Sequence, residues 1–248
     1  MPNYSPAVGD TAAGYYLIIV FYMKKVLVIA AHPDDEVLGV GGTVAKLSSL
    51  GVECYLLIVT DGSSAQYRDS DHLQEIIDAK KKETKGCADI LGFKTIHYGE
   101  LPDMRLDKTP HIVINQAIEK VIDELQPDTV FTHFWGDVNR DHQEVYKSTL
   151  VTVRPVMGQV VKELYCYRVP SSTEWTPNKA DTMFMPNYFV DIEQFAEQKY
   201  KAFACYSTEL RDYPHPRSVQ YLRENDKVVG LRVGMLAAEE FVMLRKLD

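Results

Sequence analysis

Three side chains that could build one chemical site lie close together near the start of the chain. His32, Asp34 and Asp35 directly follow an apolar run, residues 26–31, that is typical of a buried parallel strand. Ligands of open α/β sheets bind where such strands end. His32 and Asp35 are close enough in sequence for one tight turn to aim both at the same point, and Asp34 can face that point without occupying it. An imidazole, a carboxylate and a spare carboxylate suit a catalytic metal site with its own general base.

The two carboxylates alone have a simpler explanation. Acidic residues in the first turn of a helix interact favourably with the helix dipole, and a helix is expected to begin here. This explanation does not account for His32, so the pattern favours a metal site.

A second polar cluster follows a later apolar segment. Residues 133–142 read HFWGDVNRDH and begin at the end of a strand predicted over residues 129–133. In a parallel sheet this cluster lies at the same edge as His32. His142 begins a predicted helix, from which its side chain can point back over the sheet edge and provide a third ligand. Together with Asp35, the two histidines would leave a fourth position for water, as in a catalytic zinc site.

The elements that position these clusters alternate along the chain. We predict strands at residues 26–31, 53–60, 94–98, 129–133, 163–167 and 188–191. We predict helices at residues 37–50, 73–91, 111–125, 142–153 and 192–204. The alternation predicts an α/β fold with a mainly parallel sheet, helices on both faces and an active site at the C-terminal edge of the strands. Residues 171–186 are expected to form a long active-site loop, and residues 231–247 a strand or turn followed by a short helix.

Composition limits the kinds of partner. The chain of 248 residues is 46% hydrophobic and 25% charged, which is ordinary for a globular protein. Its net charge of −8 argues against a surface for nucleic acid or anionic membrane, since either would need a basic face. No two of the four cysteines are close enough for a Cys-x-x-Cys pair, so we expect reduced thiols and a cytoplasmic location.

Residues 1–22 differ from the rest of the chain. They contain an apolar stretch, residues 14–22, that lacks the preceding basic residue of a signal peptide and is too short to span a bilayer. We interpret residues 1–22 as an N-terminal extension that is non-native or disordered, although it could add a strand or an oligomer contact. No linker rich in proline, glycine or serine divides the remainder, so residues 23–248 are expected to form one domain.

The two polar clusters give the chain a resemblance to a known family. Residues 31–36 read AHPDDE after an apolar strand, and residues 137–142 read DVNRDH. With shorter matches at residues 91–92 and 101–103, these motifs resemble the PIG-L/LmbE-like family of zinc-dependent N-deacetylases over residues 24–241. The resemblance implies a Rossmann-like α/β fold and the removal of an acetyl group from an N-acetylated amino sugar or its conjugate.

The resemblance also implies roles for residues at the matching positions. It implies that His32, Asp35 and His142 bind Zn²⁺ and that Asp34 is the general base that activates a zinc-bound water. Two imidazoles and a carboxylate would also accept another divalent transition metal. Asp103 matches a position that the family uses to bind sugar hydroxyls.

The chain departs from the family pattern at two positions. Asn139 stands where many members have a histidine that assists the oxyanion, and an amide can donate a hydrogen bond but cannot carry a proton. Asp141, a partner of that histidine in the family, would then have no imidazole to orient at that position. Lys80 stands where the family commonly has an arginine, and lysine lacks the planar fork for bidentate contacts with phosphate or sugar.

Residues 213–218, which read YPHPRS, are the best remaining candidate for substrate contacts because two prolines stiffen them. Either His215 or Arg217 could face the substrate. We hypothesise that His215 supplies the acid–base help that Asn139 cannot, although the metal or His133 could also compensate. Trp175 could offer an aromatic platform for a sugar. A surface turn and a buried tryptophan are the plainer alternatives.

Parts of the sequence also suit functions other than sugar deacetylation. Gly39, Gly41 and Gly42 could indicate nucleotide binding, but they fall inside a predicted helix and not in the turn before it, so they favour close packing of that helix on the sheet. A sugar-binding protein without catalysis, and the same metal site acting on another amide or an ester, both stay open. We expect a small N-acetylated sugar or glycoconjugate as partner, no nucleic acid or membrane, and a homo-oligomer as one possible state.

Overall fold

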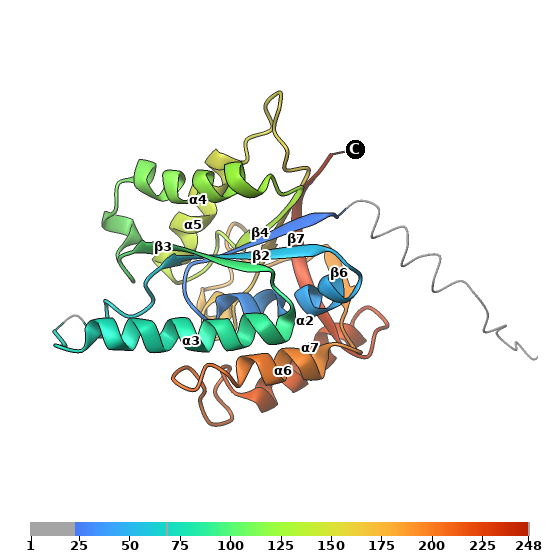
Figure 1. The fold of residues 1–248 in the computed structure, drawn as a ribbon. Coiled ribbons are helices and arrows are strands. Elements are labelled where there is room, and N and C mark those ends of the chain that lie inside the picture. Colours follow the sequence, from blue (N-terminus) through green and yellow to red (C-terminus); the bar gives the residue numbers. More distant parts are fainter. Residues whose placement is uncertain (1–22, 68, 248) are drawn as a thin grey trace, which may run out of the picture.

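The strands form one sheet at the centre of the molecule (Figure 1). The computed structural model describes residues 23–67 and 69–247, so the predicted extension, residues 1–22, lies outside the described residues. The strand order is β3-β2-β1-β4-β5-β7-β6. Neighbouring strands from β3 to β5 are parallel, whereas β7 is antiparallel to β5 and β6. The strands are β1 (Lys25–Ala30), β2 (Glu53–Thr60), β3 (Thr95–Leu101), β4 (Thr129–His133), β5 (Glu163–Tyr167), β6 (Tyr188–Asp191) and β7 (Ala238–Lys246).

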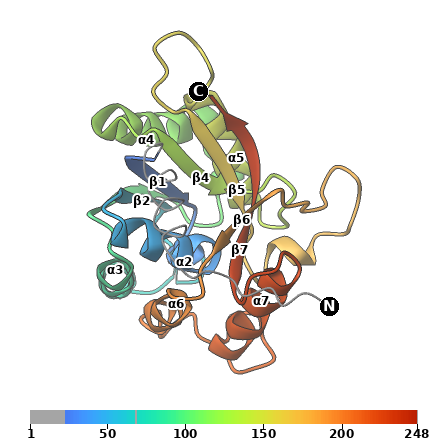
Figure 2. The same cartoon turned by 90° about the vertical axis from the view of Figure 1, so that its right-hand side faces the viewer.

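Helices cover both faces of this sheet, as predicted. α4 and α5 lie on one face, and α2, α3, α6 and α7 lie on the other (Figures 1 and 2). The α-helices of the described residues are α2 (Asp35–Ser49), α3 (Leu73–Leu91), α4 (His111–Leu125), α5 (Arg140–Thr152), α6 (Ala196–Phe203) and α7 (Val219–Leu231). The architecture is therefore the expected α/β fold, and its one sheet supports our proposal of one domain over residues 23–248.

The strand β1 divides the core into two halves. Val26 and Val28 pack in the cluster that includes α2, α3 and α6, while Leu27 and Ile29 pack in the cluster that includes α4 and α5. Successive side chains of a strand point to opposite faces, so a strand covered on both faces must be apolar throughout. This is why the apolar run before His32 predicted a central strand.

Close packing of α2 against the sheet requires glycine at position 39. A Cβ atom on Gly39 would lie 2.2 Å from the ring of Tyr167 on β5, a distance that side-chain atoms do not adopt. Gly39 thus serves packing on the sheet, as the sequence predicted, whereas Gly41 and Gly42 face Lys199 of α6 and Ile192.

The sequence prediction is wrong for the last part of the chain. A strand or turn followed by a short helix was expected over residues 231–247, but the helix α7 comes first and β7 is a long strand. The sequence analysis missed α7, although Ser218 caps it by accepting the N–H of Tyr221 at 3.1 Å. Glu239 and Glu240 are buried in β7, and these charges interrupt the apolar pattern on which a strand prediction depends.

A buried ion cluster joins the elements around β7. Nζ of Lys199 lies 3.0 Å from Oδ2 of Asp226 on α7 and 2.9 Å from Oε1 of Glu239 on β7. Glu239 also accepts the backbone N–H groups of Gly42 at 2.9 Å and Thr43 at 2.7 Å. The cluster therefore ties α6, α7 and β7 to α2, whose N-terminus carries the Asp34–Asp35 pair.

The four cysteines are free, as predicted. In the described part of the chain, no helix combines the length and the apolar character that crossing a membrane requires. The cytoplasmic location stays a prediction.

Removal of the Lys199 side chain is expected to destabilise the fold strongly. Lys199→Ala leaves two carboxylates buried without their cation, which costs about 3–5 kcal/mol in comparable buried pairs. Lys201→Ala, at an exposed position of the same helix, is expected to cost less than about 1 kcal/mol. Unfolding in urea measures both values, and equal small losses for the two variants would contradict a stabilising role for the cluster.

Candidate metal centre

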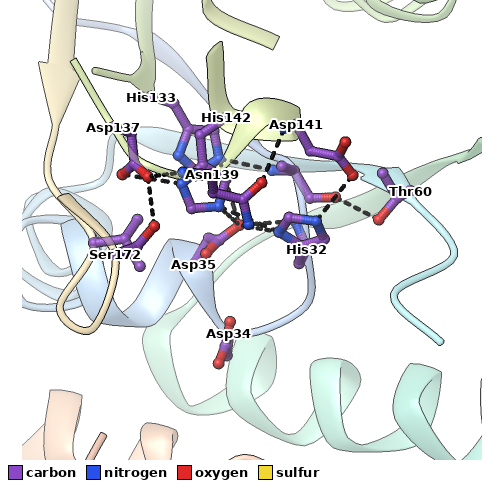
Figure 3. Close-up of polar contacts among 12 residues, drawn as sticks. His32, Asp34, Asp35, Thr60, His133, Asp137, Asn139, Asp141, His142 and Ser172 are labelled. Atoms are coloured by element: carbon purple, nitrogen blue, oxygen red, sulfur yellow. Dashed lines mark hydrogen bonds and ion pairs between the residues drawn. The ribbon is translucent and has the colours of Figure 1, made fainter. Parts of the chain in front are cut away.

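Two loops meet at the C-terminal edge of the sheet because β1 and β4 are parallel neighbours. The loop after β1 carries His32, and the loop after β4 leads into α5, which carries His142. Figure 3 shows the side chains of His32, Asp35 and His142 gathered at one place, with Asp34 set apart from them.

The three predicted ligands converge on one point. Nδ1 of His32 lies 3.2 Å from Oδ2 of Asp35 and 3.2 Å from Nε2 of His142, and this Nε2 lies 3.3 Å from the same Asp35 oxygen. Tetrahedral zinc with bonds of about 2.0–2.1 Å needs ligand atoms about 3.3 Å apart. The other oxygen of Asp35, Oδ1, is buried with no hydrogen-bond partner among the described residues. Donor types, spacing and the unpaired oxygen all fit a bound divalent metal.

A tight turn fixes two of these ligands. The backbone N–H of His32 donates to Oδ2 of Asp35 at 2.8 Å, and the N–H of Asp35 donates back to the His32 carbonyl at 3.3 Å. Between them, Asp34 has a φ of 106°, in the left-handed region that non-glycine residues rarely adopt. With this strained backbone, the Asp34 side chain lies apart from the three ligands (Figure 3).

A carboxylate behind His142 holds its ring in place. Nδ1 of His142 lies 3.1 Å from Oδ2 of Asp137. Ser172 and Thr173 donate hydroxyl hydrogen bonds to Asp137 at 2.5 and 2.6 Å. Burial opposes charge on both partners, but the Asp35 and Asp137 carboxylates raise the pKa of His142 to about 9. The charge of His142 and these hydrogen bonds lower the pKa of Asp137 to about 2, again against burial.

A second pair of carboxylates lies behind His32. Its Nε2 lies 3.2 Å from Oδ2 of Asp141 and 3.3 Å from Oδ1 of Asp103. Asp141 also accepts the N–H of Leu106 at 3.0 Å. Because Asn139 replaces a histidine of the family pattern, Asp141 was expected to have no imidazole to orient at that position. In the structure it contacts the imidazole of His32 instead.

These contacts create a second group of potential metal donors, which His32 shares. The group consists of His32, Asp103 and Asp141. A neutral imidazole offers one lone pair, and its other nitrogen carries a hydrogen. If Nδ1 of His32 binds a metal, Nε2 donates to a carboxylate, which is the usual arrangement around metal-bound histidines. The group that contains two imidazoles is therefore the better candidate for a metal site.

His133 is a supporting residue whose role the sequence analysis left open. It is fully buried, and its Nε2 accepts the N–H of Ala31 at 2.8 Å. Its ring stacks on His142 with centroids 3.9 Å apart, and Tyr167 lies behind it. Burial and the nearby His142 hold the pKa of His133 well below its usual range. His133 is thus a neutral ring that packs against the predicted ligand His142.

Asn139 caps α5. Its Oδ1 accepts the backbone N–H of Asp141 at 2.9 Å, and its Nδ2 lies 3.6 Å from Sδ of Met104. The cap fixes the first turn of α5, from which Asp141 and His142 project.

Asp34 lies among groups that the sequence analysis did not connect to it. Glu36, also missed, is buried, and it accepts the backbone N–H of Asp34 at 3.1 Å and the hydroxyl of Tyr206 at 2.5 Å. Burial raises the pKa of Asp34 to about 8, although the Arg217 guanidinium opposes this rise. Burial likewise raises the pKa of Glu36 to about 7, against the hydrogen bond from Tyr206.

The other predicted substrate residues are spread around the site. Nη1 of Arg217 lies 3.5 Å from Oδ2 of Asp34. Lys80 is buried and pairs with Glu209, so its ammonium group is not free. Trp175 is 56% exposed, and its ring meets that of His215 edge-on at 6.2 Å.

Residues 27–153, slightly more than half of the chain, match the model of the PIG-L family, described as GlcNAc-PI de-N-acetylase. The chain belongs to the PIG-L family.

Several proteins that are similar in sequence to this PIG-L chain are named as deacetylases. It is 29% identical over 228 residues to diacetylchitobiose deacetylase of Thermococcus kodakarensis, covering 88% of this chain and 81% of the relative. It is 24% identical to 1D-myo-inositol 2-acetamido-2-deoxy-alpha-D-glucopyranoside deacetylase of Rhodococcus jostii, covering 90% and 92%. The fold matches N,N'-diacetylchitobiose deacetylase from Pyrococcus horikoshii with a TM-score of 0.72 and 24% identity, over 98% and 95% of the two chains.

Replacement of Asp141 tests the support behind His32. Asp141→Asn keeps the size of the side chain but removes the charge that faces Nε2 of His32, so zinc affinity is expected to fall about 10- to 100-fold. Competition with a chromophoric chelator measures it. Asp107→Asn, which changes a carboxylate paired with the exposed Arg140 at 3.1 Å, is the control and should bind as the wild type does. Equal zinc affinities in the wild type, Asp141→Asn and Asp107→Asn would show that Asp141 does not support the metal site.

Proposed function

We propose that this protein is a metal-dependent hydrolase that removes the N-acetyl group from an amino sugar or its conjugate. The observation that carries the proposal is the triangle of donor atoms from His32, Asp35 and His142, which fits three corners of a tetrahedral metal site and leaves the fourth for the reaction. The names of the relatives, which concern N-acetylated sugars, support the class of substrate. The substrate is then a small N-acetylated sugar or glycoconjugate.

The three donors would hold Zn²⁺, for which their types and spacing are suited, although other divalent transition metals use similar ligands. Bound there, the ion would lower the pKa of a water molecule and polarise the acetyl carbonyl. His32 and His142 are aligned by Asp141 and Asp137, so the donors are oriented before any ligand arrives.

Asp34 is the general base of this proposal. It is next to a ligand in sequence, its side chain lies apart from the donor triangle, and its Oδ2 accepts no hydrogen bond from the described residues. Oδ2 would take the proton of the attacking water and return it to the nitrogen that leaves with the sugar. Burial raises the pKa of Asp34, and a bound cation would favour its ionised form, so the carboxylate could accept a proton and return it near neutral pH.

The remaining candidates surround this base and the ligands. We propose that Asp103, beside His32, also binds sugar hydroxyls. Asn139 fixes the start of α5, and its Nδ2, which donates to Sδ of Met104, has a second hydrogen that could contact the substrate. Nδ1 of His215 accepts the N–H of Arg217 at 3.0 Å, so any acid–base help from His215 would use its other nitrogen. The exposed ring of Trp175 is proposed as a platform for the sugar. A homo-oligomer stays a prediction.

Release of acetate tests the function. The protein is expected to release acetate from at least one of a panel of N-acetyl sugars, sugar nucleotides and glycoconjugates. Chelation should abolish this activity and added Zn²⁺ should restore it, since the metal supplies the activated water. Failure of the metal-loaded protein on the whole panel would favour a sugar-binding protein or a different amide or ester as substrate.

Two substitutions separate the base from the ligands. Asp34→Asn should keep the metal and reduce kcat by about 10²- to 10⁴-fold, because it removes only proton transfer. His142→Ala should lose the metal itself, because it removes one of three protein ligands. Metal content measured by mass spectrometry, beside kcat, decides between these roles. Loss of metal in Asp34→Asn, or full metal content in His142→Ala, would contradict the assignment.

A further inference from the structure

The guanidinium group of Arg217 lies beside Asp34 at the candidate site. Nη1 of Arg217 lies 3.5 Å from Oδ2 of Asp34, and the Arg217 side chain is 26% exposed. The Asp34 oxygen is buried and unpaired, so a small movement on substrate binding would turn this contact into a hydrogen bond. Arg217 thus reaches the proposed base from the loop before α7.

Arg217 is held in this place by several contacts. Its backbone N–H donates to Nδ1 of His215 at 3.0 Å. Its Nε donates to Oγ of Ser171 at 2.9 Å, and its Nη1 donates to Oε2 of Glu209 at 2.8 Å. Two of the three guanidinium nitrogens, Nε and Nη1, therefore already donate hydrogen bonds within the protein. Nη2 has no hydrogen bond or ion pair with the residues that the structure describes, and it can donate to a substrate oxygen.

Glu209 connects this arginine to α3. Nζ of Lys80 pairs with Oε1 of Glu209 and donates to Oγ1 of Thr208 at 2.7 Å. Basic and acidic side chains thus alternate along a chain of contacts from Lys80 through Glu209 and Arg217 to Asp34. Contacts with Glu209 and Thr208 thus engage two of the three hydrogens on Nζ of Lys80.

We propose that the guanidinium of Arg217 contacts the substrate beside Asp34, and that Glu209, held by Lys80, is the residue that positions it. The inference rests on the proposed deacetylase function. Nη2 of Arg217 donates to a substrate oxygen beside the scissile amide, where negative charge develops during the reaction. A planar fork can contact Ser171, Glu209 and the substrate at once, which a lysine ammonium cannot do in the same geometry.

Substitution of Arg217 tests its contact with the substrate. Arg217→Ala should lower kcat/KM on the order of 100-fold while metal content and the thermal midpoint stay close to the wild-type values. Free guanidinium ion should restore part of the lost rate, because it can occupy the vacated place. Arg217→Lys should stay at least about 10-fold below the wild type.

Arg211→Ala is the matched control. It removes the same charge from the same loop, where Arg211 is exposed and its Nη1 donates to the backbone carbonyls of Thr208 and Leu210. Its kcat/KM should equal that of the wild type. Unchanged kcat/KM in Arg217→Ala, or a loss that accompanies lost metal or lost stability and does not respond to guanidinium, would overturn the proposal.

Glu209→Gln tests the positioning role without relying on turnover. A crystal structure of this variant should show the Arg217 guanidinium displaced from Asp34, and kcat/KM should fall about 10-fold because the charged partner is lost. A guanidinium that stays beside Asp34 would overturn the role of Glu209. If the wild-type protein released no acetate from any substrate, the proposed function would fail, and the structure of this variant would still decide the positioning claim.

Discussion

The parallel pairing of β1 with β4 is the interaction on which the site depends. The rings of His32 and His142 come from positions 110 residues apart, and their nearest nitrogens lie 3.2 Å from each other. The register that places Val28 opposite Phe131 sets this separation. A slip of one residue would move one loop by about 3.3 Å and reverse the faces of the strand. Metal–ligand distances tolerate about 0.2 Å, so the site requires this one register.

The buried polar groups around the ligands have a common purpose. Asp137 fixes the ring of His142, Asp141 fixes that of His32, and the neutral ring of His133 fills the space behind them. The carboxylates of Asp137 and Asp141 each accept at least one other hydrogen bond, which offsets the cost of their burial. The donors are therefore oriented by contacts within the protein, as a site that must hold one geometry requires.

Local patterns predicted the central strands and the three donors, because an apolar run followed by polar residues is visible in a few positions of sequence. The rest depends on contacts between distant segments. Glu36 was missed because its partner Tyr206 is 170 positions away. The strand β7 was missed because Glu239 is buried against a lysine of another helix. The pairing of Lys80 with Glu209 was not predicted because the two residues are 129 positions apart.

The position of a bound metal tests the account most directly. In crystals of the protein grown with Zn²⁺, an anomalous difference map at the zinc edge should show one peak about 2.0–2.2 Å from Nδ1 of His32, Oδ2 of Asp35 and Nε2 of His142. A peak bound instead to Nε2 of His32 with Asp103 and Asp141, or no peak at this edge of the sheet, would contradict the metal centre and the hydrolysis built on it.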